Sequence, residues 1–205
     1  MPKITAVDKI YRKSNLREIT LDDGDKCIVL NESVYTNGVK VENSYYDNEW
    51  LEMLANMQYE LGMNYALGYI SYGNKSIYEI VTNLRKKEVS EIGIERTIQR
   101  LKVLRYVDDE RYAVDYVNSY KQSRGQIRLR IELRNKGVEN EYIENAISGL
   151  DNEHEYAREL ANRFMKSREW NNKEKDRLIR HLLAKGYSYD IVKSVICDFG
   201  DNCEY

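Results

Sequence analysis

The stretch GQIRLRIELRNKGV, residues 125–138, shows most directly how this chain folds. Its apolar residues Leu129 and Leu133 lie four positions apart, which is the spacing of neighbours on one face of an α-helix. Lys136 and Gly137 follow that apolar face. Glycine readily adopts the left-handed conformation that ends many helices, and a cation is favourable at the negative end of the helix dipole. The stretch therefore predicts a helix that ends just before Gly137.

The same pattern recurs 49 residues before and 49 residues after this stretch. The matched positions are Ile80, Leu129 and Leu178; Leu84, Leu133 and Leu182; Val89, Val138 and Tyr187; Ile94, Ile143 and Val192; and Ile98, Ile147 and Ile196. Each copy has helical spacing before, within and after a short break, which predicts three helices per copy. Because such repeats bury their apolar faces against their neighbours, we predict a mainly α, elongated array of three tandem three-helix repeats. Glu88 stands where the other copies have glycine, so a different helix end is expected there.

The residues before position 47 have the pattern of β-structure. Residues 16–30 hold two short runs rich in Ile, Thr, Leu and Val around a turn sequence, and Asn-Gly at 37–38 separates two further short runs. This pattern predicts a small N-terminal β-hairpin extension whose core is separate from that of the helices. From Trp50 onward, apolar spacings of three and four predict a long helix. The expected divisions are 1–47 for the extension, 48–106 for the first repeat, 107–150 for the second and 151–205 for the third.

Charge and cysteine content restrict the class of protein. The 32 basic and 34 acidic side chains give a net charge of -2, so a basic binding site must be local. Three cysteines, an odd number, and the absence of an apolar leader after Met1 favour reduced thiols and a cytoplasmic location. No apolar run reaches the roughly 18 residues that span a membrane. We expect a monomer.

Four stretches resemble sequence blocks of the RecX family: YVDDERYA at 106–113, GQIRLRIELRNKGV at 125–138, KGYSYDI at 185–191 and KSIYEI at 75–80. The resemblance covers residues 50–200. It departs from the family pattern at Gln126, where proline is frequent, and at Glu88, where glycine is frequent. The resemblance implies a protein that binds the RecA filament on single-stranded DNA and inhibits or modulates its recombinase, ATPase and coprotease activities. Weaker binding to double-stranded DNA is left open.

Basic side chains around the quoted stretch are the candidate contacts with the filament or its DNA. They are Lys121, Arg124, Arg128, Arg130, Arg134 and Lys136. Glu132 is the one acid among them and lies four residues after Arg128, so these two side chains are expected to pair. Arg130 and Arg134 share another face and therefore rank first. The alternative is that this face is merely a solvated, charged surface.

The acidic cluster Asp108, Asp109 and Glu110, followed by Arg111, allows a structural and a chemical interpretation. Asp108 can cap a helix that begins there, and the next two carboxylates suit its positive N-terminal dipole. A divalent cation or proton could instead be shared between the carboxylates, but no histidine or second acidic cluster is evidently paired with them. Neither histidine nor any cysteine pair has zinc-ligand spacing, and no nucleotide-binding motif is present. We therefore expect no catalytic residue, no cofactor and no metal.

Three functions from different classes follow. The first is a modulator of the RecA filament, the second an autonomous nucleic-acid-binding helical repeat protein, and the third a small hydrolase or nuclease using Asp108 and Asp109. Binding to the filament compared with binding to naked DNA distinguishes the first two.

Overall fold

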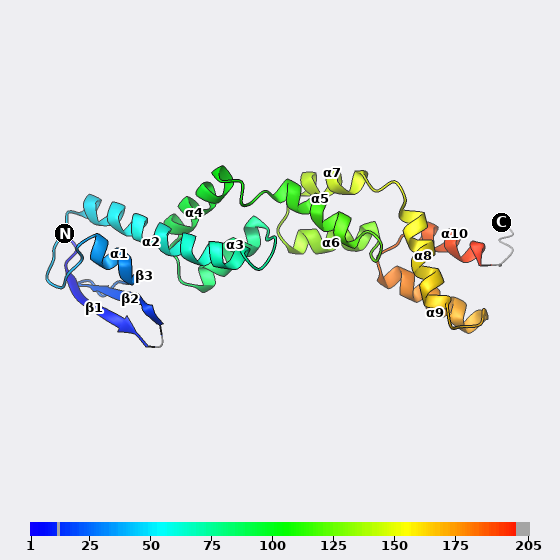
Figure 1. Ribbon diagram of the computed structural model, residues 1–205, viewed down its shortest axis with the longest axis horizontal. Helices are drawn as coiled ribbons and strands as arrows, with labels where there is room; N and C mark the ends of the chain where they lie inside the picture. Colours follow the sequence, from blue (N-terminus) through cyan, green and yellow to red (C-terminus); the bar gives the residue numbers. More distant parts are fainter. Residues whose placement is uncertain (12, 200–205) are drawn as a thin grey trace. The chain divides into compact units, whose positions relative to one another are not determined.

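The computed structural model of the chain describes residues 1–11 and 13–199. It divides into two compact units, Met1–Val107 and Asp108–Tyr205. Figure 1 shows the strands and helices of each unit. Within the described residues the strands end at Leu30, and the regular elements that follow are helices. The prediction of a mainly α protein with three-helix copies and N-terminal β-structure is confirmed.

The N-terminal sheet consists of β1 (Ile4–Ile10), β2 (Lys13–Leu21) and β3 (Lys26–Leu30), paired antiparallel in that order. Leu16 lies opposite Leu30 and Ile19 opposite Cys27, so the hairpin predicted over 16–30 is present. Its turn places Gly24 at a φ of 91°, a conformation that glycine adopts without steric cost.

The prediction of β-structure on both sides of Asn37 and Gly38 is wrong. The chain there forms α1 (Asn31–Thr36), a short helix whose end is followed by Gly38 at a φ of 64°. An Asn-Gly pair supplies the left-handed conformation that a hairpin turn needs, but the same conformation also ends a helix. The dipeptide by itself could not distinguish these two uses.

The expectation of separate cores for the extension and the helices is also wrong. The long helix α2 (Asp47–Ile70) buries Trp50 and Met57 in one cluster with Ile4 and Ile19 of the sheet. The buried Gln58 connects the same helix to β3, because its Nε2 donates to the carbonyl oxygen of Ile28 at 2.6 Å. Removing the sheet would therefore expose apolar side chains of α2, which makes 1–47 an integral part of the first unit.

The first repeat is completed by α3 (Ile77–Lys86) and α4 (Glu91–Val103), which pack with the second half of α2. The N-terminus of α3 has a capping box, in which the Ser76 side chain accepts from the Glu79 amide and the Glu79 carboxylate accepts from the Ser76 amide.

The end of α3 differs from our expectation. Glu88 has a φ of 61°, close to the 73° of Gly137 at the matching position of the second copy. The first copy therefore ends its middle helix in the same left-handed way, with a residue for which that conformation is unfavourable.

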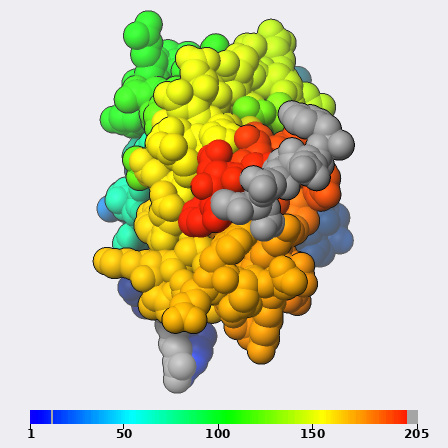
Figure 2. All heavy atoms as spheres, turned by 90° about the vertical axis from the view of Figure 1, so that its right-hand side faces the viewer, coloured from blue at the N-terminus to red at the C-terminus, as the bar shows by residue number. Residues whose placement is uncertain are grey.

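The second unit holds the other two copies. The second repeat consists of α5 (Asp109–Tyr120), α6 (Gln126–Asn135) and α7 (Asn140–Ser148). The third consists of α8 (Glu153–Met165), α9 (Asn172–Ala184) and α10 (Tyr189–Asp198). Each repeat has its own buried cluster, around Leu129 and Leu133 in the second and around Leu178 and Leu182 in the third. Figure 2 shows the third repeat, with α10 lying between α8 and α9.

Among the described residues, no helix is both long and apolar enough to cross a membrane. The expectation of reduced thiols holds for Cys27, whose pKa is raised to about 11 chiefly by burial. Cys203 lies outside the described residues.

Candidate functional site

The candidate basic residues surround α6, whose two faces have different roles. Leu129 and Leu133 are fully buried and hold the helix against the second repeat's core. Gly125 is the N-cap and has no side chain with which to cap the helix. Because the first amides of a helix have no partner inside it, their hydrogen bonds must come from elsewhere.

The third repeat supplies those partners. The amide of Gly125 donates to the carbonyl oxygen of Lys185 at 2.9 Å, and the amide of Ile127 donates to that of Gly186 at 3.2 Å. Between them, the amide of Gln126 donates to Oε1 of Glu153 at 2.8 Å. The N-terminus of α6 is thereby closed, so a phosphate group cannot use it as an anion site without displacing the third repeat.

This junction depends on close approach of two glycines. Gly186 adopts a φ of 88°, and a Cβ on Gly125 would lie 2.3 Å from its carbonyl oxygen. Burial raises the pKa of the Glu153 carboxyl at the junction, although the hydrogen bond from Gln126 acts in the opposite direction. The second and third repeats are therefore joined by backbone contacts that a larger residue at position 125 would obstruct.

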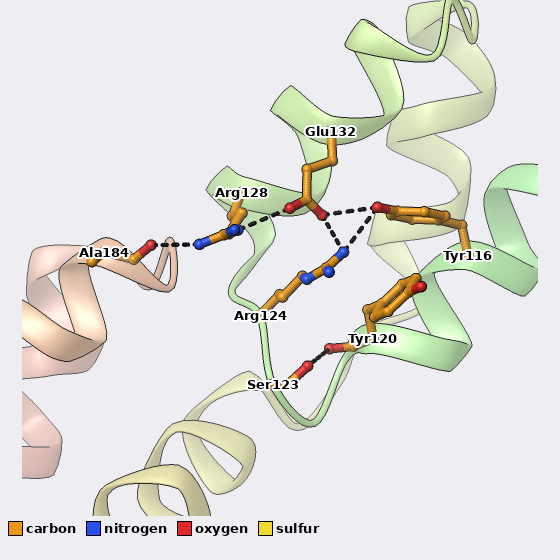
Figure 3. A network of polar contacts seen from close by, with 7 residues as sticks. All are labelled: Tyr116, Tyr120, Ser123, Arg124, Arg128, Glu132 and Ala184. Atoms are coloured by element: carbon orange, nitrogen blue, oxygen red, sulfur yellow. Dashed lines mark hydrogen bonds and ion pairs between the residues drawn. The ribbon is translucent and has the colours of Figure 1, made fainter. Parts of the chain in front are cut away.

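Glu132 is the centre of a polar network beside the junction (Figure 3). It accepts from Arg124, from Nε of Arg128 at 2.9 Å and from the Tyr116 hydroxyl at 3.0 Å. Burial opposes ionisation of Glu132, but the hydrogen bonds from Arg128 and Tyr116 and the charge of Arg124 outweigh it, so its pKa lies below the usual value. The Glu132 carboxylate thus compensates the charges of two candidate residues, Arg124 and Arg128.

The same two arginines have further structural contacts. The Arg124 guanidinium lies 3.8 Å from the centroid of the Tyr120 ring, which is cation–π distance. Arg128 Nη1 donates to the carbonyl oxygen of Ala184 at 3.1 Å and so connects α6 to the end of α9 (Figure 3). Arg124 and Arg128 therefore serve the packing of the second unit in this conformation.

Arg130, which the sequence places on a separate face, is also paired. Its Nε and Nη2 donate to the two carboxylate oxygens of Glu144 on α7 at 2.9 to 3.1 Å. Glu132 is the one acid within the basic stretch of sequence, but Glu144 from α7 also compensates part of its charge. Arg134 differs, because it is exposed and its Nε donates to the neutral side-chain amide of Asn140 at 3.0 Å.

The two remaining candidates lie at helix ends. Lys121 follows α5 and its Nζ lies 3.0 Å from Oδ1 of Asn118. Lys136 follows α6, with its ammonium 5.7 Å from the centroid of the Tyr116 ring. The six basic residues are thus distributed over several faces, and the structure does not bring them into one continuous patch of uncompensated charge.

The acidic cluster occupies the start of α5. Asp108 is the N-cap, and its Oδ1 accepts from the backbone amide of Arg111 at 3.0 Å. Asp109 and Glu110 lie in the first turn, where negative charge is favourable, and the Arg111 guanidinium lies 3.8 Å from Asp115. Within the described residues, no group of three potential ligands is arranged to hold a metal ion.

Several residues of this region were not singled out from the sequence. Glu144 and Glu153 were missed because they come from other helices, and only packing brings them to α6. The tyrosine row on α5 was detectable in part, since Tyr112, Tyr116 and Tyr120 lie four residues apart and their adjacent rings are in contact.

The fold defines a tandem three-helix repeat protein with a charged, polar region around the middle helix of the second repeat. Models of the three RecX three-helix domains match residues 63–101, 108–147 and 151–196, described as the first, second and third domain. The chain belongs to the RecX family. The matches lie inside the expected repeats 48–106, 107–150 and 151–205, whose bounds stay a prediction.

Relatives and solved structures agree with this assignment. The chain is 31% identical to "Regulatory protein RecX" of Clostridium botulinum (strain Alaska E43 / Type E3), with 96% of this chain and 95% of that protein covered. It is 28% identical to the protein of the same name from Bacillus subtilis (strain 168), over 100% of this chain and 78% of the relative. A crystal structure of regulatory protein RecX has the same fold, with a TM-score of 0.63 at 21% identity over 95% of this chain and 98% of the other. RecX from Lactobacillus salivarius aligns with a TM-score of 0.61 at 26% identity, covering 69% of this chain and 96% of the other.

Proposed function

We propose that this chain binds the RecA filament formed on single-stranded DNA and inhibits or modulates its recombinase, ATPase and coprotease activities. The observation that carries the proposal is the match of all three helical domains to the RecX family, together with relatives named as regulatory proteins along nearly the whole chain. Action on the filament places the protein in the cytoplasm, and we expect it to act as a monomer.

The proposed action is binding without chemistry of its own. The Asp108 carboxylate caps α5, and Glu132 is occupied by Arg124, Arg128 and Tyr116. The carboxylates of Asp108 and Glu132 are therefore engaged in hydrogen bonds that stabilise the fold. Contacts with the filament would come from side chains of the second repeat, with the exposed Arg134 first among the candidates.

A titration at near-physiological salt tests the proposal. The chain is added to RecA on single-stranded DNA while ATP turnover is followed, and its binding to the same DNA without RecA is measured in parallel. We expect turnover to fall at chain concentrations well below those that saturate naked DNA. Equal affinity for DNA with and without RecA would instead favour an autonomous nucleic-acid-binding protein. Release of nucleotides from the DNA, lost in an Asp108→Ala, Asp109→Ala variant, would favour the nuclease.

A further inference from the structure

The exposed side of α6 carries an unusual pair of apolar residues among its arginines. Ile127 and Ile131 are 47% and 51% exposed, while Leu129 and Leu133 on the opposite side are buried. Ile127, Arg130, Ile131 and Arg134 follow the spacing i, i+3, i+4, i+7, so they lie on one side of the helix. We call these four residues the α6 outer face.

We propose that the α6 outer face binds a protein surface that combines an apolar groove with carboxylates, and that this surface belongs to the protein component of the filament rather than to its DNA. The inference rests on the proposed function and names the partner of the same region. A helix that docks into a protein groove presents anchors with this i, i+3, i+4, i+7 spacing.

The two isoleucines are the first reason to prefer protein over nucleic acid. A sugar–phosphate backbone is bound by cations and hydrogen-bond donors, and unpaired bases are bound by stacking on flat aromatic or guanidinium groups. Branched aliphatic side chains offer neither kind of contact. They gain by removal from water, which an apolar protein groove provides.

The charges of the face are the second reason. Arg130 is held by both carboxylate oxygens of Glu144, so its charge is already compensated and its side chain oriented. Arg134 donates to the neutral side-chain amide of Asn140, and Glu144, which is already bonded to Arg130, acts on it only through its charge, so the Arg134 guanidinium can still bind a partner. A face with apolar residues and one available cation suits a carboxylate beside an apolar groove better than a row of phosphates.

The order of side chains on the α6 outer face is particular to the second repeat, although the matching face of α9 also combines two aliphatic residues with an arginine. The matching positions of α9 are Asp176, Ile179, Arg180 and Leu183, and those of α3 are Tyr78, Val81, Thr82 and Arg85. Neither set alternates isoleucine with arginine. The junction with the third repeat also holds the first turn of α6 in place, through the amides of Gly125, Gln126 and Ile127. A face fixed in this way loses little conformational freedom on binding.

The test uses the full chain and two probes, RecA assembled on oligo(dT) and the same oligo(dT) alone. The variant Ile127→Ser, Ile131→Ser removes the apolar anchors, and serine has nearly the same helix propensity as isoleucine. Val114→Ser is the control, because Val114 is an exposed aliphatic residue of the same repeat, at 42%, on α5. We expect filament binding about 30-fold weaker for the double variant, as for loss of an interface anchor. Binding to oligo(dT) and the melting temperature should be unchanged, and the control should behave as the unaltered chain.

A second variant tests the sign of the partner's charge. Ile131→Asp places a carboxylate on the face and should weaken filament binding more than the double serine variant does, with the difference shrinking as salt is added. Unchanged filament binding by the folded double serine variant would overturn the inference while leaving the proposed function intact. An equal loss on filament and on oligo(dT) would overturn it in favour of a nucleic-acid contact. If the unaltered chain does not bind the filament, the proposed function is wrong, and so is the inference that the α6 outer face binds the protein component of the filament.

Discussion

Replacing Gly125 by alanine should uncouple the second and third repeats. The backbone conformation at Gly125 has a φ of -78°, which alanine adopts easily, so the change introduces no backbone strain. The new Cβ would instead lie 2.3, 2.4 and 2.5 Å from the carbonyl oxygen and carbon of Gly186 and the amide nitrogen of Tyr187. All three are backbone atoms, so the α9 end of the junction has to move.

The size of the effect follows from the contacts that this movement breaks. The hydrogen bonds from Gly125 to Lys185 and from Ile127 to Gly186 contribute about 1 kcal/mol each, and overpacking costs about 1–3 kcal/mol more. The lower entropy of alanine in the unfolded chain offsets roughly 0.4–1 kcal/mol of this loss. We therefore expect the free energy of unfolding of the second unit to fall by about 2–4.6 kcal/mol.

Urea denaturation followed by circular dichroism measures this change, and two further variants isolate its cause. Gly125→Ser adds the same Cβ but supplies a favourable N-cap hydroxyl, so it should be destabilised nearly as much if the clash is responsible. Gly149→Ala adds a Cβ that would meet its nearest atom at 3.9 Å, and it should be neutral or slightly stabilised. If the Gly125→Ala chain were as stable as the Gly149→Ala chain, the close contact between Gly125 and Gly186 would be refuted. If Gly125→Ser had the stability of the unaltered chain, the loss of stability in Gly125→Ala would be due to poor capping of α6 and not to a clash.

Three further predictions concern single side chains. Leu133→Ala should lower the free energy of unfolding by about 2–5 kcal/mol because it leaves a cavity in the second repeat's core, and an unchanged urea midpoint would contradict its burial. Glu88→Gly should stabilise the first unit by about 1 kcal/mol, since glycine favours the observed φ of 61°; a lower melting temperature would show that the Glu88 side chain contributes more than its backbone costs. The pKa of the Glu153 carboxyl is raised, so this carboxyl stays protonated to higher pH in the folded state than in the unfolded state. Protonation of Glu153 therefore stabilises the fold fully below the ordinary glutamate pKa of about 4.3. This stabilisation is lost as the pH rises through the raised pKa. Glu153→Gln keeps an acceptor for the Gln126 amide, so its urea midpoint should vary less between pH 4 and 8, and identical pH profiles would contradict the assignment.

The sequence was informative about helices because periodicity is a local property. Leu129, Leu133 and their counterparts 49 residues away are buried as their spacing predicts, since residues four apart always share one side of a helix. The pair Arg128 and Glu132 follows from the same geometry and is present at 2.9 Å. Local spacing was ambiguous at Asn37 and Gly38, because one left-handed residue serves a turn and a helix end equally well.

Contacts between helices needed the folded chain. The pairing of Arg130 with Glu144 joins residues on α6 and α7, and the bond from Gln126 to Glu153 joins the second repeat to the third. The arginines that are close together in the sequence therefore have different partners in the structure. Arg124 and Arg128 pair with Glu132, and Arg130 pairs with Glu144. Arg134 is exposed and bonded to the neutral side chain of Asn140.

The helical class, the three copies and the family were readable from the sequence, because each depends on residue types at fixed spacings along the chain. The charges that remain available to a partner, the exposure of Ile127 and Ile131, and the core that the sheet shares with α2 became known from the folded chain. Helix geometry specifies which residues share one side of a helix, whereas segments distant in the sequence determine what packs against that side, and therefore its burial and its charge.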